Sequence, residues 1–331
     1  MIREYLKLAR SFNAGLTAFA PVLGAVAMKQ FNLTHLLLLF LIGFFGHSYG
    51  FALNDILDLK LDKTSKEIQD RPLLSKKLTL QKAWIFTILC VTIAYLLAIY
   101  LSLMTNHYLP IIILVLSSLS ITIYDLISKK YPTMDIFVAG GIFMLILYGA
   151  STVSINITLL AWIVCVLGTI QVLFMQLIAG GLKDIENDLK QGAKTFAIKI
   201  GVHMEKGLVK IPYTFKFFGY SLQIIELFLL FIPFYFIFRP LSLYNYIQFM
   251  VLFFFSILML YISYKLLNLK YFERNKARRL IGSHFQINYI LVPIMLMVLT
   301  PWTIFLVIFP PIIFLLSNLI LHGTLLQPKT M

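Results

Sequence analysis

Long apolar stretches separated by short polar segments are the dominant pattern along this chain of 331 residues. A bilayer core about 30 Å thick is crossed by a helix of about 20 mostly apolar residues. Stretches of this length recur throughout the sequence, so the pattern predicts ten membrane-spanning helices. The predicted spans cover residues 13–31, 35–53, 83–104, 108–127, 134–152, 157–182, 215–238, 244–268, 282–299 and 302–321.

Prolines interrupt the last pair of predicted spans. Pro301 stands between them, and Pro310 and Pro311 fall inside the final one. Proline lacks the amide hydrogen that an interior helical position donates, and its ring clashes with the preceding turn. We therefore expect a tight re-entry at the junction and a broken final helix, which makes nine spans plus an interfacial segment the alternative to ten.

Composition supports a membrane location. Apolar residues make up 60% of the chain and charged residues 13%, far from the values of a soluble globular protein. The two cysteines, Cys90 and Cys165, each lie deep in an apolar stretch, which argues against a disulfide framework or a cysteine metal site. The basic first ten residues lead into an apolar stretch without a cleavage pattern, so we expect the first span to be retained.

Basic residues gather in alternate loops. Of the 28 Lys and Arg residues, only Lys29 and Arg239 fall outside the N-terminus, the C-terminus and every second loop. Because short cytoplasmic loops are rich in Lys and Arg, we expect the N-terminus and the long loops 54–82 and 183–214 in the cytoplasm, at the cell membrane if the source is prokaryotic. Topology also accounts for the net charge of +14, so no nucleic-acid partner is predicted.

An acidic cluster marks the end of the second predicted span. Its residues are Asn54, Asp55, Asp58 and Asp62, and Asp70-Arg71-Pro72-Leu73 follows. On a helix, positions 54, 58 and 62 share one face, and Asp55 lies beside Asp58. Like charges at this spacing repel. We therefore expect a compensating cation, and oxygen-only ligands suit Mg²⁺.

A second acidic motif follows the sixth predicted span. Asp184 and Asp188 share a helical face, Glu186 turns away from it, and lysines stand nearby. Mg²⁺ is commonly held by one or two carboxylates together with substrate phosphates. Two such clusters facing each other would hold a diphosphate through metal ions, while Lys and Arg neutralise the leaving group. The implied chemistry is metal-assisted departure of a diphosphate from an apolar carrier.

Together the two motifs resemble the signatures of the UbiA superfamily of intramembrane prenyltransferases. The first signature, NDxxDxxxD, matches Asn54, Asp55, Asp58 and Asp62, and the second, DxxxD followed by G-x-[KR]-[ST], matches Asp184, Asp188, Gly192, Lys194 and Thr195. Shorter matches are Arg71-Pro72-Leu73, Tyr124 with Lys129 and Lys130, and Arg10 with Asn13. The resemblance covers about residues 5–300, with departures at Ser11, at Asp135 and in the tenth span.

The resemblance implies an all-α fold, a polytopic transmembrane bundle around a central cavity open to the cytoplasmic face and laterally to lipid. It implies one domain over residues 1–331, with an extra span at 302–321. Mg²⁺ is the implied cofactor. Its implied ligands, which are also the catalytic residues, are Asp55, Asp58, Asp62, Asp184 and Asp188.

The resemblance also implies the substrates and the residues that bind them. A prenyl diphosphate ionises at its allylic C–O bond and alkylates a membrane-associated acceptor, which is either an aromatic quinone or haem precursor or a glycerophosphate ether lipid. No obligate protein partner is evident. The implied substrate-binding residues are Asn54, Arg10, Asn13, Arg71, Tyr124, Lys129, Lys130, Lys183 and Lys194, although the cytoplasmic bias of basic loops also accounts for the lysines.

A secondary transporter is the alternative function. Such proteins carry internal repeats and polar or broken helices near the bilayer midplane. This sequence has one acid in the middle of a span, Glu226, and no convincing repeat. We interpret Glu226 as a hydrogen-bonded packing residue, with Gln223, one turn earlier, as its candidate partner.

Overall fold

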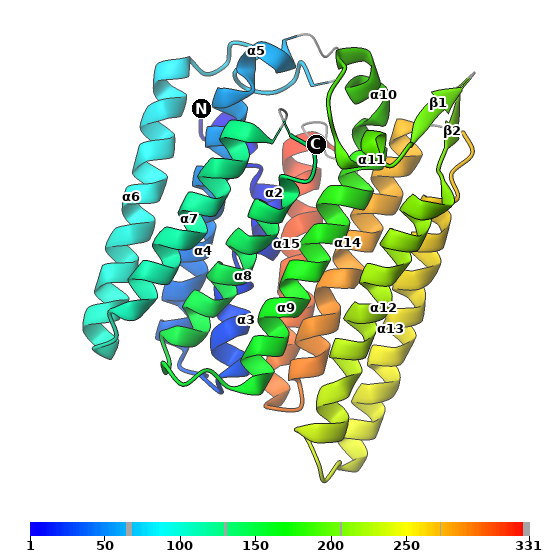
Figure 1. Cartoon of the computed structure of the whole chain (residues 1–331). Helices are drawn as coiled ribbons and strands as arrows, with labels where there is room; N and C mark the ends of the chain where they lie inside the picture. Colours follow the sequence, from blue (N-terminus) through cyan, green and yellow to red (C-terminus); the bar gives the residue numbers. More distant parts are fainter. Residues whose placement is uncertain (64–67, 129–130, 206, 272, 327–331) are drawn as a thin grey trace. The chain divides into compact units, whose positions relative to one another are not determined.

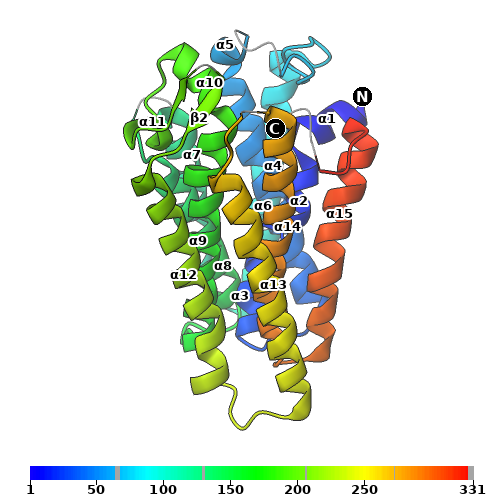
Figure 2. The ribbon, with the colours of Figure 1, turned by 90° about the vertical axis from the view of Figure 1, so that its right-hand side faces the viewer.

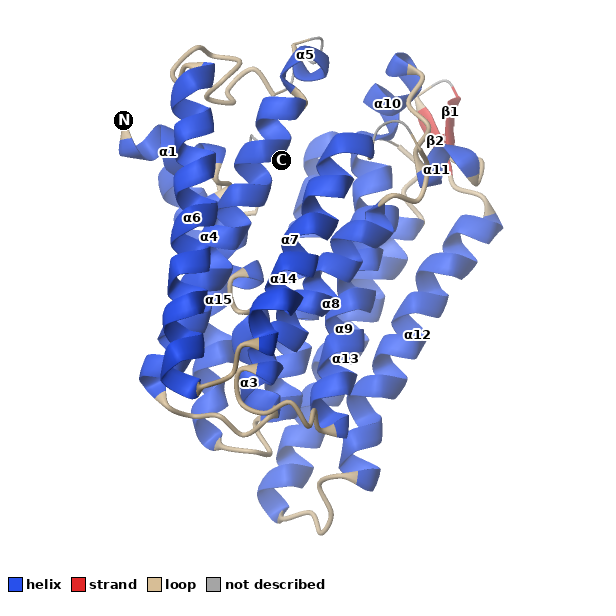
Figure 3. Ribbon diagram, turned by 60° about the vertical axis from the view of Figure 1, so that its left-hand side comes forward, coloured by secondary structure: helices blue, strands red, loops and turns tan. Residues whose placement is uncertain are grey.

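The computed structural model describes residues 1–63, 68–128, 131–205, 207–271 and 273–326 (Figure 1). These residues are almost entirely helical, and their only strands form one short hairpin (Figure 3). The chain divides into two compact units. The first comprises residues 1–126, 140–165 and 308–331, and the second comprises 127–139 and 166–307, so that the division passes through four of the helices.

The first unit is built mainly from helices at the N-terminal end of the chain. Its long helices α4 and α6 lie side by side, and each is apolar over a length that could cross a membrane. Its complete or nearly complete elements are α1 (Ile2–Leu8), α2 (Ser11–Thr17), α3 (Ala20–Ala27), α4 (Leu33–Leu57), α5 (Leu59–Asp62), α6 (Leu80–Thr105) and α7 (Leu109–Ile127). Most of α8 (Asp135–Ser151) and parts of α9 (Leu159–Leu173) and α15 (Ile304–His322) complete it.

The second unit continues from the middle of α9. Its long helices α12 and α13 form an antiparallel hairpin (Figure 2). The two hairpin helices are α12 (Tyr213–Phe236) and α13 (Leu243–Leu267). The other complete elements of this unit are the π-helical segment η1 (Phe174–Gly180), α10 (Gly181–Gln191), α11 (Phe196–Lys199), β1 (His203–Glu205), β2 (Leu208–Lys210), α14 (Arg274–Leu296) and the turn η2 (Pro301–Thr303).

The predicted polytopic helical architecture is confirmed. Among the described residues, seven helices are long and apolar enough to cross a membrane, and two shorter apolar helical stretches, Ser11–Ala27 and Asp135–Ser151, accompany them. The first predicted span is two short helices rather than one, because α3 begins afresh with Pro21 in its first turn, where no amide donor is needed. The polar loop 183–214 also contains α11 and the β1–β2 hairpin, which the sequence pattern did not predict.

The expected break in the final helix is wrong. Helix α15 runs from Ile304 to His322 with Pro310 and Pro311 inside it, while Pro301 begins the separate turn η2. Membrane helices tolerate interior prolines because neighbouring helices, hydroxyl side chains and small local adjustments of the helix satisfy the backbone groups that a proline frees. The prolines therefore do not end the helix.

Close helix crossings hold the first unit together. A Cβ added to Gly24 would lie 2.0 Å from the Ile146 carbonyl oxygen, and one added to Gly149 would lie 1.8 Å from the Pro21 carbonyl oxygen. Helices α3 and α8 thus touch through their backbones at two glycines. Small residues at such crossings let membrane helices gain the van der Waals contact that drives their association.

We expect Gly149→Ala to separate α3 from α8, because the new methyl group would meet backbone that cannot rotate away. Overpacking of a well-packed contact costs about 1–3 kcal/mol, and a backbone clash places this substitution at or above that range. The measurement is the thermal midpoint and folded yield of the detergent-solubilised protein. Gly46→Ala is the matched control, because nothing lies within 4 Å of its added Cβ; an equal loss in both variants would contradict the crossing argument.

A buried polar network ties α9, α12 and α14 together within the second unit. Glu226 is fully buried, and its Oε1 accepts a hydrogen bond of 2.8 Å from Gln171 Nε2. In the amide orientation that its partners require, Asn288 Nδ2 also donates to Glu226, at 2.5 Å to Oε1 and 3.2 Å to Oε2. Gln223, the expected partner, instead contacts Ser263 and His284. Glu226 is therefore a packing residue, held by amide donors from two other helices.

We expect Glu226→Leu to destabilise the protein more than Glu226→Gln. Leucine would remove the acceptor that the Gln171 and Asn288 side chains share, although Gln171 Nε2 would keep its bond to the Asn288 carbonyl. An unmade buried hydrogen bond costs about 1–3 kcal/mol. Glutamine keeps an acceptor oxygen in the same place. Thermal unfolding in detergent tests this order, and equal midpoints for the two variants would contradict it.

Candidate functional site

The first acidic motif lies where α4 passes into α5. Asp58 ends α4, yet the helical hydrogen-bond pattern continues across it: the Asp58 amide donates to the Asn54 carbonyl and the Asp62 amide to the Asp58 carbonyl, both at 2.9 Å. The one-face arrangement predicted for positions 54, 58 and 62 therefore survives the change of helix. Asp55, Asp58 and Asp62 are all buried, each less than 10% exposed.

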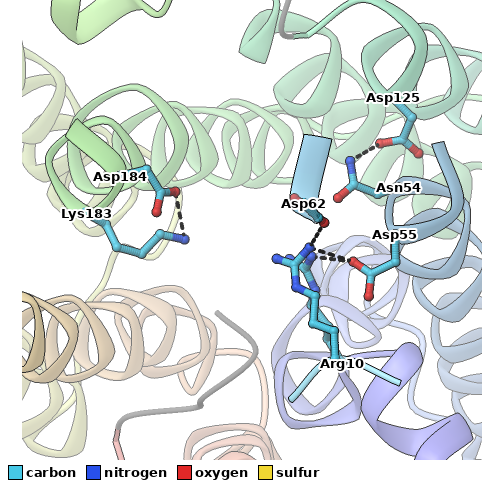
Figure 4. A network of polar contacts seen from close by, with 8 residues as sticks. Arg10, Asn54, Asp55, Asp62, Asp125, Lys183 and Asp184 are labelled. Atoms are coloured by element: carbon cyan, nitrogen blue, oxygen red, sulfur yellow. Dashed lines mark hydrogen bonds and ion pairs between the residues drawn. The ribbon is translucent and has the colours of Figure 1, made fainter. Parts of the chain in front are cut away.

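Arg10 supplies the first positive charge against this motif. Its NH2 atom donates to Asp55 Oδ1 at 2.7 Å (Figure 4). The Arg10 backbone is left-handed, with φ of 44°, a conformation that costs a non-glycine residue about 1–3 kcal/mol. The ring of Phe51 lies 4.9 Å from the guanidinium carbon, and His47 Nε2 lies 3.3 Å from the Arg10 carbonyl oxygen. The surroundings thus hold Arg10 in the turn that aims its side chain at Asp55.

Arg71 supplies the second positive charge and bridges two acids. Its NH1 atom lies 3.2 Å from Asp55 Oδ1 and also donates to Asp62 Oδ2. The two residues that follow it explain how it is placed: Leu73 is buried in an apolar cluster, and the Leu78 amide donates to the Pro72 carbonyl. The buried members of that cluster are Leu8, Ala52, Ile56, Leu73, Leu78 and Ala83.

The motif's expected compensating charge is therefore supplied, at Asp55 and Asp62, by arginine. Among the described residues, no three His, Cys, Asp or Glu side chains lie close enough together to hold a metal ion as they stand. The donor atoms themselves are carboxylate and amide oxygens, which is the chemistry that Mg²⁺ takes. The residues thus fit a hard divalent cation in donor type, with arginines occupying two of the carboxylates.

Asp125 is a residue of this site that the sequence analysis missed. It lies near the end of α7, is 7% exposed, and its Oδ1 accepts from Asn54 Nδ2 at 3.2 Å. Its neighbour Tyr124 is half-buried on the same helix. The available signal was an acid in the last turn of an apolar helix, one residue after a tyrosine that the family resemblance had singled out.

The second acidic motif lies on α10, within the second unit. Asp184 and Asp188 are four residues apart on that helix, and Lys183 Nζ lies 3.2 Å from Asp184 Oδ2 (Figure 4). Glu186 pairs instead with Lys190 at 2.7 Å, as expected for a residue turned away from the motif. The sequence predicted that this motif lies on a helix that continues the sixth span. In the structure, α10 follows α9 directly through η1.

Two further features of the second unit complete this motif. Gly192 ends α10 in the left-handed conformation, with φ of +65°, which glycine adopts without steric cost. It leads to an exposed Lys194 and to Thr195, which precedes α11. Arg278 of α14 is buried close enough to Asp184 for their charges to interact. The sequence did not single out Arg278, because it stands among several basic residues that are typical of a cytoplasmic loop.

Three predicted substrate-binding residues remain to be placed, namely Asn13, Lys129 and Lys130. Asn13 lies on α2, one turn after Arg10, and its backbone N–H donates to the Arg10 carbonyl at 2.8 Å. Lys129 and Lys130 lie outside the described residues. The structure thus brings together Asn54, Asp55, Asp62, Arg10 and Arg71 in the first unit, and Lys183 with Asp184 in the second.

Comparison with known proteins identifies the family. A digeranylgeranylglyceryl phosphate synthase of Methanococcus aeolicus is 29% identical over 210 residues, covering 60% of this chain and 69% of that protein. The corresponding synthase of Methanococcus maripaludis is 28% identical over 256 residues, covering 70% and 85%. A solved structure of a UbiA homologue from Archaeoglobus fulgidus bound to GPP and Mg²⁺ shares the fold, with a TM-score of 0.63, 16% identity, and coverage of 90% and 99%.

The family model gives the most direct result. The model of the UbiA prenyltransferase family matches residues 15–290, which include both acidic motifs and the helices between them. Prenyltransferases of this family are enzymes, so the transporter alternative is set aside. The chain therefore belongs to the UbiA prenyltransferase family and is a multi-pass membrane prenyltransferase, as the resemblance of its two motifs to the family signatures implied.

Proposed function

We propose that this protein uses Mg²⁺ to transfer an isoprenoid from a prenyl diphosphate to a glyceryl phosphate acceptor, with release of diphosphate. The observation that carries the proposal is the set of buried carboxylates Asp55, Asp58 and Asp62, with Asn54, Arg10 and Arg71 beside them, in a chain of this family. Acids and cations concentrated at the end of an apolar helix suit a substrate with a charged head and an apolar tail.

In the proposed reaction, the allylic C–O bond of the donor breaks and its electron pair leaves with the diphosphate. The allylic carbon then bonds to an acceptor hydroxyl oxygen, which releases its proton to water. Mg²⁺, when bound, neutralises the charge that develops on the departing oxygen. Asp55, Asp58, Asp62, Asp184 and Asp188 are the proposed ligands of the metal, in keeping with the oxygen ligands that Mg²⁺ prefers.

Cationic and polar side chains would bind the substrates around these acids. Arg71 and Lys183 already lie within 4 Å of carboxylates that we assign to the metal, and Arg is suited to bidentate phosphate contacts. We assign the same role to the other substrate-binding residues predicted above. These are Arg10, Asn13, Asn54, Tyr124, Lys129, Lys130 and Lys194, of which Lys129 and Lys130 lie outside the described residues.

The choice of acceptor rests on the relatives. Their name, digeranylgeranylglyceryl phosphate synthase, describes a product with two geranylgeranyl groups on glyceryl phosphate. A glyceryl phosphate ether with a free hydroxyl is accordingly our first acceptor, ahead of the aromatic quinone or haem precursors. Its phosphate would be a second anionic group for the basic side chains to bind.

We also propose the orientation and organisation expected from the sequence. The N-terminus and both acidic motifs face the cytoplasm, because nearly all Lys and Arg residues lie on that side. The whole chain acts as one functional domain around a substrate cavity that opens to the cytoplasm and laterally to lipid. A diphosphate head in water and an isoprenoid tail in the bilayer would reach such a cavity together.

We expect the purified protein to release diphosphate from a labelled prenyl diphosphate only when Mg²⁺ and a glyceryl phosphate ether acceptor are present. Asp58→Ala and Asp184→Ala should each lower turnover by at least about 100-fold, because each removes a charged ligand that no neighbour replaces. Product formation and diphosphate release are measured together, so that simple hydrolysis of the donor is distinguished from transfer.

Glu205→Gln is the control for this experiment, because Glu205 is an exposed acid on β1 paired only loosely with Lys210, at 3.8 Å. It should keep wild-type turnover. Full activity in both alanine variants would refute the assigned metal ligands. Transfer to an aromatic acceptor, but not to the glyceryl phosphate ether, would refute the assigned acceptor and leave the reaction class intact.

A further inference from the structure

We propose that Asp125 is an additional carboxylate ligand for the divalent cation of the first acidic cluster, supplied by α7 and outside both sequence motifs. The inference rests on the proposed function, because it concerns the same cation. It adds an element to the site: a residue 63 positions from Asp62 in sequence joins the Asp-rich helix end.

The geometry around Asp125 is the first argument. Its side chain points from α7 towards Asn54 on α4, and the Asn54 Nδ2 to Asp125 Oδ1 bond joins the two helices (Figure 4). Its second oxygen, Oδ2, is buried and has no hydrogen-bond partner among the described residues. One side of the carboxylate is therefore held in place, and the other is left without a donor.

The buried Oδ2 atom of Asp125 destabilises the protein as long as it has no partner. A buried polar atom without a partner loses its hydration and gains nothing in return, a penalty of about 1–3 kcal/mol that rises for charged groups. The charges of Asp58 and Asp55 act unfavourably on Asp125, and Arg10 is the favourable one among the charges that act on it. A divalent cation would satisfy the Oδ2 atom and relieve the repulsion among these acids.

The orientation of Asn54 is the third argument. Because its NH2 group donates to Asp125, its amide oxygen points away from Asp125 (Figure 4). An amide oxygen is a hard ligand of the kind that accompanies carboxylates around divalent cations. Asp125 thus contributes an oxygen of its own, and its hydrogen bond to Asn54 also directs the Asn54 amide oxygen away from Asp125.

Two substitutions separate a ligand from a residue that only positions Asn54. Asp125→Asn removes the charge, but its amide oxygen can still accept the hydrogen bond from Asn54. Asp125→Leu removes both the charge and the acceptor. The assay is Mn²⁺ binding to the full-length protein in detergent, followed by electron paramagnetic resonance without any substrate, so that affinity is measured independently of turnover.

We expect both variants to bind Mn²⁺ about 10- to 100-fold more weakly than the wild type, as is typical when a group that supports a metal site is lost. Glu205→Gln should bind as the wild type does. Wild-type affinity in Asp125→Asn with weak binding in Asp125→Leu would overturn the proposal, because Asp125 would then only position Asn54. The metal-free thermal midpoint of each variant confirms that the folded protein is being compared.

The same titration distinguishes failure of this inference from failure of the proposed function. If the wild type binds Mn²⁺ tightly and neither Asp125 variant changes the affinity, the role of Asp125 is wrong and the metal-dependent transfer stands. If the wild type binds no Mn²⁺ either alone or with inorganic diphosphate present, both the metal part of the proposed function and the role of Asp125 are overturned, because Mg²⁺ is commonly held together with phosphate oxygens.

Discussion

A carboxylate buried in an apolar chain must be compensated, and this constraint governs the structure around the first motif. The free energy of transferring an ion out of water exceeds what a single distant charge returns. Asp55 therefore has two guanidinium partners, Arg10 and Arg71, and Asp62 shares the second. The segments that carry these arginines lie on either side of α4 in sequence. The ion pairs therefore connect the segment before α4 and the segment after it to the acids at the end of α4.

The scaffold shows how strongly those partners are held. Arg10 accepts a left-handed backbone in order to reach Asp55, and Arg71 is anchored by Leu73 and Leu78 in an apolar cluster shared with α1, α4 and α6. A strained backbone conformation that the surrounding contacts maintain, like that of Arg10, is characteristic of functional sites. The short helices at the start of the chain and the loop before α6 thus serve the same purpose: each delivers one cation to the end of α4.

The sequence predicted the parts of this arrangement that depend on periodicity and local spacing. The apolar stretches predicted most of the long helices, and the spacing of Asn54, Asp58 and Asp62 predicted their common face. The interruption of the first span at Pro21 and the continuity of α15 through Pro310 could not be predicted, because proline is tolerated at a helix start and also inside a membrane helix. Likewise, a single acid such as Asp125 has no spacing partner, and only tertiary structure places it beside Asn54.

Two buried acids illustrate how structural and functional roles can be separated. Glu226 and Asp125 both lie within apolar helices, but both carboxylate oxygens of Glu226 accept hydrogen bonds, from Gln171 and Asn288. Asp125 is half satisfied, with one oxygen held by Asn54 and the other without a donor among the described residues. A fully hydrogen-bonded acid needs no ligand to be stable in the membrane. Because an acid with one free oxygen beside like charges is stabilised by a cation, it is Asp125, and not Glu226, that belongs with the metal chemistry.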